Sequence, residues 1–312
     1  MGLSIIWKVI DLLYNKVAYW TIPPAIQHLL GECMKSVQLK SKDLSCDCGL
    51  RDLVARNSEL KDRHKGERCF ILATGPSVKE QDLTVLQGEL CIAVSHFFLH
   101  KDILLIRPRY HVLAPYHPPF TFEDIKKVFD GFNNFYSDDV IYLFGHYPYD
   151  FSVYNFLQIN PIYTRENSYF IDYTHSYPLD EDNYMNSMVW DIMKSPFQVR
   201  TVIYTAIQAA VYMGCTEIYL IGCDHDYLSD MKRVTNHHFY KEEEGVSDAE
   251  HLSTFNSERW FEEYYFRWKQ YRLMHKYVEG HGCKIANATK GGMLDVFPRV
   301  DLRALFRNRR QI

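Results

Sequence analysis

The stretch Arg68-Cys-Phe-Ile-Leu-Ala-Thr-Gly-Pro-Ser77 decides the fold of this 312-residue chain. Its first six residues have the length and composition of a buried β-strand. The next four form a tight turn, because Gly75 lets the backbone approach a ligand and Pro76 suits the first turn of a helix. Ser77 adds a hydroxyl beside the N–H groups of a helix start, which is a natural seat for phosphate. The plain alternative is a strand-to-helix turn that binds nothing.

Further apolar runs follow along the chain, and helix-like segments separate them. The runs cover residues 90–94, 110–113, 140–144, 217–221 and 284–286, and the clearest helical segments cover residues 121–129, 200–213 and 258–279. Gly214 follows the second of these helices, at the position where a helix C-terminus favours glycine. Strands that alternate with helices predict an α/β fold, namely a Rossmann-like, mostly parallel sheet with helices on both faces.

Composition predicts how the chain is divided. Residues 67–312 form the Rossmann-like domain, residues 31–66 form a polar connector, and residues 1–30 form an amphipathic helix. Inside the domain, residues 146–198 are rich in Tyr, Asn, Asp and Pro and show little periodicity. A long segment of this kind predicts a lid or a substrate-side insertion.

The N-terminal helix has two interpretations. Residues 4–22 are strongly apolar, but Lys8, Asp11 and Lys16 interrupt them, and a charge at the centre of a membrane span costs about 2.5–3.5 kcal/mol. A transmembrane helix is therefore disfavoured. A signal peptide is disfavoured as well, because the segment has neither the basic region nor the cleavage site of one. We expect the helix either to dock on the domain or, the favoured alternative, to lie in the membrane interface. The arginines of the C-terminal stretch 299–310 would then meet anionic lipid.

Charge and cysteine usage exclude some classes of protein. With 35 Lys and Arg against 39 Asp and Glu, the net charge of −4 gives no electrostatic case for nucleic-acid binding. The 8 cysteines include no CxxC pair, so a structural zinc site is not indicated. We expect a reduced, cytoplasmic protein, held peripherally on the inner face of the bacterial membrane.

The candidate binding residues come from the ends of the predicted strands. Ligands of an open parallel sheet bind outside the carboxyl ends of its strands, where small and polar residues leave room for them. This rule selects Thr74, Gly75, Pro76, Ser77, Ser95, Gly222, Cys223 and Asp224.

Two further groups of residues suggest specific chemistry. Asp224 and Asp226 form an Asp-x-Asp pair, whose oxygens suit Mg²⁺ or Mn²⁺ on a diphosphate, although Asp224 is equally suited to a ribose hydroxyl. His237 and His238, with Tyr240 beside them, fall in the polar loop after residues 217–221. A histidine there can remove a proton from an acceptor hydroxyl near neutral pH, and the alternative is an ordinary exposed loop histidine.

With these residues, the chain resembles the bacterial sialyltransferases of glycosyltransferase family 42 and the related domain of Maf-type flagellin glycosyltransferases. The turn after the first strand is Gly-x-Gly-Pro-Ser in the family and Ala73-Thr-Gly-Pro-Ser77 here. The resemblance extends over about residues 67–299, through the segment 206–222 to the final stretch 287–299. The chain has Ala73, Ser95, Ala114 and Asp226 where the family has a glycine, two asparagines and a tyrosine.

The resemblance implies a reaction and roles for the candidate residues. The reaction is an inverting, metal-independent transfer of a CMP-activated sugar, a nonulosonate such as sialic acid or Kdo, to a cell-surface glycan acceptor, and it needs no cofactor. The family's catalytic histidine matches His237 or His238, and His238 is the better match. The leaving phosphate is expected to accept hydrogen bonds from Tyr227 or Tyr240.

Three rival functions stay open from the residues alone. The first is a metal-dependent transferase that uses Asp224 and Asp226 with a UDP- or GDP-sugar. The second is a diphosphokinase of the pterin type, which needs ATP and Mg²⁺. The third is a non-catalytic scaffold that only binds a glycan.

Overall fold

The computed structural model of the chain describes residues 48–117, 120–176, 178–194, 196–226, 229, 237–241 and 256–311. Contacts divide the chain into two units, residues 1–51 and 52–312. The predicted helix of residues 1–30 and most of the connector lie outside the described residues. Within the described part of the chain, no helix is both long enough and apolar enough to cross a membrane.

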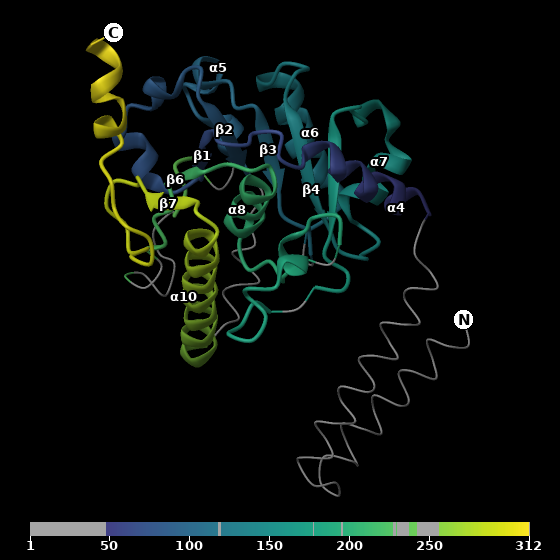
Figure 1. The fold of residues 1–312 in the computed structure, drawn as a ribbon. Coiled ribbons are helices and arrows are strands. Elements are labelled where there is room, and N and C mark those ends of the chain that lie inside the picture. Colours follow the sequence, from purple (N-terminus) through teal and green to yellow (C-terminus); the bar gives the residue numbers. More distant parts are fainter. Residues whose placement is uncertain are drawn as a thin grey trace, which may run out of the picture. The chain divides into compact units, whose positions relative to one another are not determined.

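A seven-stranded sheet forms the centre of the domain, and all its strand pairs are parallel (Figure 1). The strands are β1 (Arg68–Leu72), β2 (Leu90–Val94), β3 (Tyr110–Leu113), β4 (Ile141–His146), β5 (Ser168–Asp172), β6 (Glu217–Ile221) and β7 (Lys284–Asn287), in the order β5-β4-β3-β2-β1-β6-β7. This sheet confirms the predicted parallel α/β fold.

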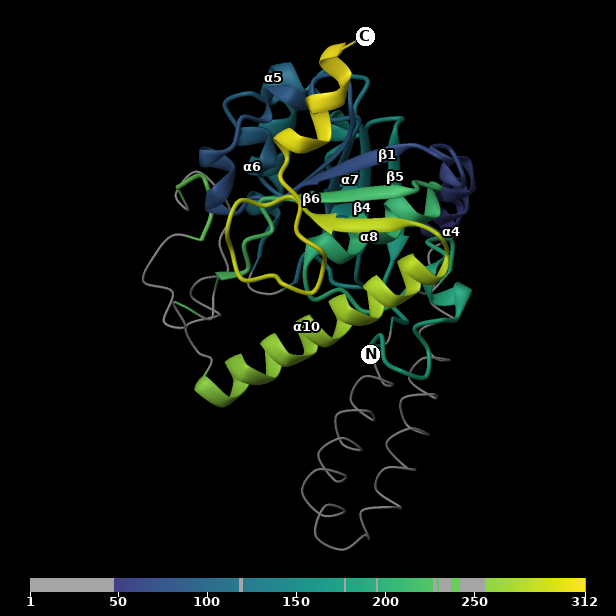
Figure 2. The same cartoon turned by 60° about the vertical axis from the view of Figure 1, so that its left-hand side comes forward.

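Alternation along the strands supplies both faces of the sheet with apolar side chains. One face, which includes Ile71, Ile92 and Leu220, packs against α8 (Val202–Tyr212) and α10 (Ser257–Gly280). The opposite face, which includes Phe70 and Leu72, packs against short helices: η3 (Pro76–Glu80), η4 (Leu83–Leu86), α5 (Ile103–Ile106) and η10 (Arg303–Gln311). Figures 1 and 2 show α8 and α10 together on one side of the sheet and α5 with the C-terminal helix on the other.

Seven further helices belong to the described part of the chain. They are α4 (Cys48–Ala55), η2 (Arg56–Leu60), η5 (Phe97–Leu99), α6 (Phe122–Phe135), α7 (Val153–Ile159), η6 (Pro161–Tyr163) and η7 (Ser187–Trp190). Thr121 caps α6 with its side chain, and Asp124 reciprocates at the Thr121 N–H, which forms a capping box. Gly214 takes a φ of +82° after α8, as its predicted role at the helix end requires.

The segment 146–198 contains structure that its sequence does not announce. Residues 168–172 form β5 at the edge of the sheet, paired with β4 from Tyr142–Ser168 to His146–Asp172. Beyond β5, Tyr173, Trp190 and Phe197 are buried in the core on the α8 side. Part of the segment that we expected to be a lid is therefore built into the sheet and its core.

Candidate functional site

The candidate site lies where the order of the strands reverses. From β1 the chain adds β2, β3, β4 and β5 on one side, then crosses back to place β6 on the other side of β1. In parallel α/β sheets such a switch point leaves a crevice at the carboxyl ends of the two strands, because their connections leave in opposite directions. A cavity of about 170 Å³ opens there. Most predicted residues line it: Thr74, Gly75, Ser95, Gly222, Cys223, Asp224, Asp226, His237 and His238.

Asp224 fastens the turn after β1 to the turn after β6. Its carboxylate accepts the Ser77 N–H at 3.2 Å and the Ser77 hydroxyl at 2.8 Å. Gly75 lies so close that a β-carbon there would stand 1.9 Å from Asp224 Oδ2 and 2.5 Å from the Gly222 carbonyl oxygen. The glycine is therefore needed for the contact between the two turns, in addition to any approach of a ligand.

This contact corrects the expected role of Ser77. From the sequence we expected the Ser77 hydroxyl and the neighbouring N–H to bind a phosphate. In the structure Ser77 is buried, and its hydroxyl and its N–H both donate to Asp224. A phosphate in the cavity needs other donors. The residues that line the cavity do not include Ser77 or Pro76.

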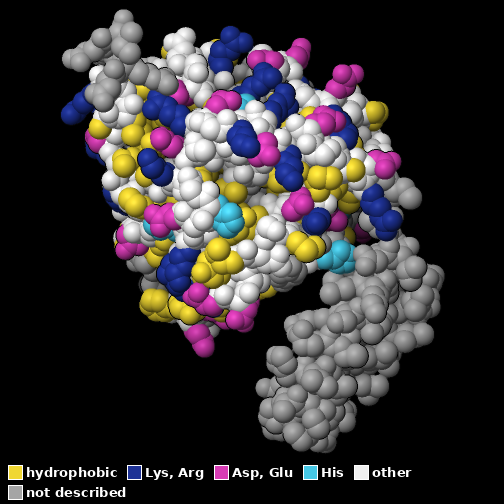
Figure 3. Space-filling view, viewed as in Figure 1, with side chains coloured by type: hydrophobic (Ala, Val, Ile, Leu, Met, Phe, Trp, Pro, Cys, Tyr) yellow, Lys and Arg dark blue, Asp and Glu magenta, His cyan; other side chains and the backbone are white. Residues whose placement is uncertain are grey.

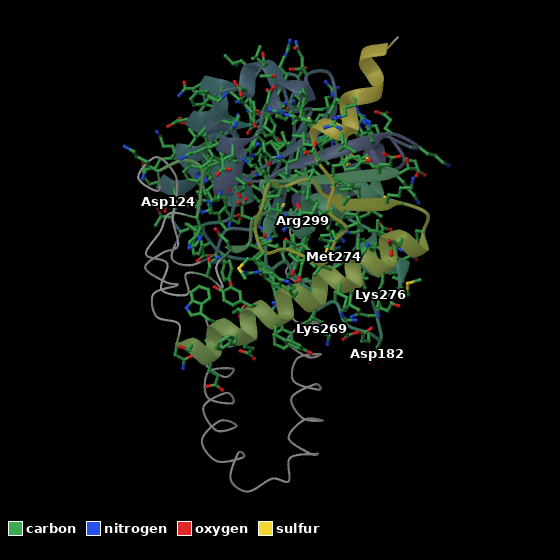
Figure 4. All side chains as sticks on the ribbon, turned by 90° about the vertical axis from the view of Figure 1, so that its left-hand side faces the viewer. Asp124, Asp182, Lys269, Met274, Lys276 and Arg299 are labelled. Atoms are coloured by element: carbon green, nitrogen blue, oxygen red, sulfur yellow. The ribbon has the colours of Figure 1, made fainter. Side chains whose placement is uncertain are left out.

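The loop after β7 forms hydrogen bonds with the backbone of Cys223 and Asp224. Met293 N–H donates to the Asp224 carbonyl at 2.7 Å, and Thr289 Oγ1 accepts the N–H of Cys223 at 3.0 Å. Arg299 holds the loop itself, since its guanidinium donates to the carbonyls of Thr289, Gly291, Gly292 and Leu294. Figure 4 shows Arg299 in this loop, above the long helix α10 that carries Lys269, Met274 and Lys276.

Asp226 also lines the cavity, but its carboxylate contacts His237 rather than Ser77. Its Oδ1 lies 3.0 Å from Nδ1 of His237, whose side chain is only 5% exposed, whereas the Asp226 side chain is 34% exposed. A carboxylate on one ring nitrogen fixes the tautomer of an imidazole and directs the other nitrogen. Asp226 and His237 thus form a carboxylate–imidazole pair in the wall of the cavity.

His238 occupies the same wall in a different environment. Its Nδ1 lies 3.1 Å from Thr74 Oγ1, and its ring stacks on Tyr240 with 4.9 Å between centroids and 8° between planes. The backbone holds this segment to the end of β1, because Phe239 N–H donates to the Thr74 carbonyl at 2.9 Å. Tyr240 itself is buried, and Tyr227 lies outside the described residues.

Burial dominates the electrostatics of the site. It raises the pKa of Asp224, an effect to which the Asp226 charge adds and which the Ser77 hydrogen bonds oppose. It lowers the pKa of His96 to about 4, with a contribution from His238, and that of His225 to about 3. Both histidines are thus neutral at pH 7 and serve as hydrogen-bonding groups: His225 Nε2 lies 2.8 Å from the Tyr271 hydroxyl.

The cavity is also lined by residues that we did not predict from the sequence. Thr201, Val202 and Ile203, at the N-terminus of α8, line the cavity. The Thr201 side chain does not cap the helix, so the partial positive charge of the helix start faces the cavity without a side-chain acceptor from the N-cap residue. The only sequence signal was the predicted start of the helix at residue 200, and nothing in it pointed to the site.

The two carboxylates of the Asp-x-Asp pair bind separate partners. Asp224 directs its two oxygens to Ser77, and Asp226 directs an oxygen to His237. Among the described residues, no group of three or more His, Cys, Asp or Glu side chains lies together. On the face in Figure 3, Lys and Arg are interspersed with Asp and Glu, with no continuous basic surface.

Comparisons with known proteins give similarity at the level of structure. No family model matches the chain, and no curated protein does. The monofunctional alpha-2,3-sialyltransferase Cst-I from Campylobacter jejuni matches with a TM-score of 0.44 and 13% identity, over 75% of this chain and 80% of that one. Monomeric CstII matches with a TM-score of 0.41 and 16% identity, over 74% of this chain and 85% of that one. The similarity concerns the course of the backbone.

Proposed function

We propose that the protein is a glycosyltransferase that moves a sugar from a nucleotide-activated donor to a hydroxyl of a cell-surface glycan. One observation carries the proposal: the cavity at the switch point is lined by three histidines, His225, His237 and His238, and by the N-terminus of α8. Such an arrangement pairs a proton acceptor with a seat for negative charge. Transfer of a sugar from a phosphate needs both, because the acceptor loses a proton and the leaving nucleotide gains charge.

The reaction is a direct displacement with inversion. The acceptor oxygen attacks the anomeric carbon, its proton passes to a histidine, and the bond between that carbon and the phosphate oxygen breaks. The pair of electrons stays on the phosphate, where the start of α8 stabilises it. Tyr240 is buried with its hydroxyl 3.4 Å from His96 Nδ1, so we assign it the role of supporting His238 through ring stacking. The hydrogen bond from Tyr240 to the leaving phosphate, which the family resemblance implied, stays a prediction.

The size of the cavity bears on the donor. Pockets that enclose a whole small-molecule ligand measure about 300–1,000 Å³, whereas this cavity measures about 170 Å³. It accommodates the reacting sugar or the phosphate, and the rest of the donor extends beyond it. We propose a CMP-linked nonulosonate such as sialic acid or Kdo, because a single phosphate is served by hydrogen-bond donors without a cation.

The base is one of two neighbouring histidines. We propose His238, which is half-buried and lines the cavity beside Thr74. The competing candidate is His237, which has a carboxylate partner in Asp226. The assignment predicts that His238→Ala lowers kcat by about 10²–10⁴-fold and leaves nucleotide affinity nearly unchanged.

His237→Ala is the matched control for this experiment. It removes the same ring from the next residue, so His238 is the base if the His237 variant keeps most of its kcat. The opposite result moves the role to His237 and its Asp226 partner. Normal kcat in both variants contradicts a histidine base in this loop.

A thermal-shift experiment tests the class of function. The full chain is heated with CMP, UDP, GDP or ATP, each with EDTA or Mn²⁺. Stabilisation by CMP in EDTA is the expected result. A response to UDP, GDP or ATP that needs the metal favours the metal-dependent transferase or the diphosphokinase. Stabilisation by none of them, with binding to a glycan array, favours a scaffold.

We further propose that the enzyme works at the inner face of the bacterial cytoplasmic membrane. The proposal rests on the apolar residues 4–22, which lie outside the described residues. Deletion of residues 1–25 is expected to move the protein to the soluble fraction and to keep nucleotide affinity within a few-fold. An unfolded product instead assigns the helix to the core of the domain.

A further inference from the structure

Ser95 has an unusual backbone at the edge of the cavity. It follows β2 and lines the cavity, and its φ is 51°, in the left-handed region that residues other than glycine rarely adopt. Asn and Asp enter this region more readily than Ser does. A serine in this conformation therefore needs neighbours that hold it there.

Two consecutive residues of β3 hold Ser95 from either side. Its N–H donates to the Val112 carbonyl at 3.2 Å, which continues the sheet. Its carbonyl lies 2.8 Å from Nε2 of His111. Because the N–H and the carbonyl of one residue are both fixed to β3, the φ and ψ angles between them are fixed as well.

The carbonyl also determines the state of the His111 ring. A carbonyl only accepts, so Nε2 carries the proton and donates it to Ser95. In a neutral imidazole Nδ1 is then an acceptor, and the Tyr136 hydroxyl stands 2.8 Å away to donate to it. Burial lowers the pKa of His111 to about 3, in agreement with a neutral ring. The result is a directed relay from Tyr136 through His111 to Ser95.

The conformation of Ser95 influences the proposed base. The left-handed residue turns the chain out of β2 and places His96 in a buried position 3.4 Å from the Tyr240 hydroxyl. Tyr240 in turn stacks on His238. Without the turn at Ser95, the chain would leave β2 in another direction, and the support behind Tyr240 and His238 would be lost.

We propose that His111 is a positioning residue, which holds Ser95 in the left-handed conformation and thereby sets the shape of the cavity and the place of His238. His111 is not among the residues that line the cavity. His111 holds Ser95 whatever ligand the cavity binds, and only the effect on ligand affinity rests on the proposed function.

The experiment measures Ser95 conformation and ligand affinity separately. His111→Leu removes the donor and puts an apolar side chain in its place. His111→Gln supplies an amide N–H that can reach the Ser95 carbonyl. Tyr136→Phe removes only the hydroxyl that donates to His111. Carbon-13 chemical shifts of Ser95 in serine-labelled full-length protein report its backbone conformation. Calorimetry reports the Kd for CMP, and thermal unfolding reports stability.

We expect His111→Leu to move Ser95 out of the left-handed region and to weaken CMP binding by about tenfold, which is the effect of about 1.4 kcal/mol. His111→Gln recovers most of both. A second substitution, Ser95→Asn in the His111→Leu protein, restores part of the affinity because asparagine tolerates this conformation. Phe129→Leu is the control: Phe129 is buried on α6, the helix that ends just before Tyr136, so its variant lowers Tm and leaves Kd and Ser95 unchanged.

Unchanged Ser95 shifts in a folded His111→Leu protein overturn the inference. If that variant does not fold, the Tyr136→Phe protein is measured instead, since loss of one hydroxyl preserves the packing. Unchanged Ser95 shifts in that protein also overturn the inference. An equal loss of affinity in Phe129→Leu also overturns it, because the effect would be one of general stability. If the wild-type protein binds no CMP, the donor proposal fails, while the Ser95 shifts still decide the role of His111.

Discussion

Two parts of the molecule beside the sheet differ in how they are filled. At the carboxyl ends of β1 and β6 a cavity is lined by polar side chains. The segment 146–198 instead buries Tyr173, Trp190 and Phe197 in the core on the α8 side. The difference follows from topology and packing. Connections diverge between β1 and β6, whereas Trp190 stacks on Tyr277 of α10 and Gln208 of α8 donates to the Val189 carbonyl.

The largest expected effect tests whether the packed segment 146–198 is only structural. Trp190 stacks on Tyr277 at 4.0 Å, packs edge-on against Phe197 and donates its indole N–H to the Tyr184 carbonyl. Trp190→Ala is expected to lower the free energy of unfolding by about 3–5 kcal/mol, measured by urea denaturation. Affinity for CMP stays within about twofold. Loss of binding with little loss of stability would instead make this segment a working lid.

The second effect tests the cavity at the carboxyl ends of β1 and β6. In Gly75→Ala the new β-carbon meets Asp224 and the Gly222 carbonyl, so the two turns must separate. We expect a loss of about 1–3 kcal/mol of stability together with loss of nucleotide binding. Gly88→Ala is the control, because Gly88 has a φ of +79° but open space around it; it is expected to cost about 1 kcal/mol of backbone strain and no affinity. Unchanged binding in Gly75→Ala would separate the turn from the site.

The smallest effect concerns the buried charge of Asp224. Its pKa is raised in the folded protein, mainly by burial, so the folded state holds the proton more tightly than the unfolded state does. Stability contributed by this group therefore increases as pH falls from neutral through the raised pKa, and it levels off below the unfolded value of about 3.9. Asp224→Asn lacks this titration. The stability of the wild type relative to Asp224→Asn is expected to rise as the pH is lowered from 7 to 4.

The direction of this trend discriminates between two accounts of Asp224. If the Ser77 hydrogen bonds outweighed burial, the pKa would be lowered, and the relative stability would fall in acid. Urea denaturation of both proteins at several pH values measures the sign directly.

The contrast between the cavity and the packed segment also explains what could be predicted from the sequence. The bounds of β2, β3 and β6 follow from short apolar runs with turn residues at their ends, and the observed strands have the predicted limits. The strand β5 was missed because Ser168–Asp172 is short and stands among aromatic and polar residues without a period. Its pairing with β4 is a tertiary effect that no local pattern records.

The site divides in the same way. Strand ends predicted that Thr74, Ser95 and Asp224 would meet, because the rule for parallel sheets depends only on topology. His238 was a candidate from the loop after residues 217–221 and from the family resemblance. That Ser77 donates to Asp224 could not be predicted, since it depends on the distance between two turns about 147 residues apart. The left-handed Ser95 was hidden for a similar reason, because the group that holds it lies on a different strand.

The position of β1 has a consequence for the synthesis of the chain. β1 lies between β2 and β6, and β6 follows β1 by about 145 residues. At about 5–20 residues per second, β6 leaves the ribosome on the order of ten seconds after β1. During that interval β1 has an open edge that invites pairing with other chains. Entry of β6 closes this edge and delivers Asp224 to Ser77 in the same step, so a nascent chain becomes protected from aggregation when its site is assembled.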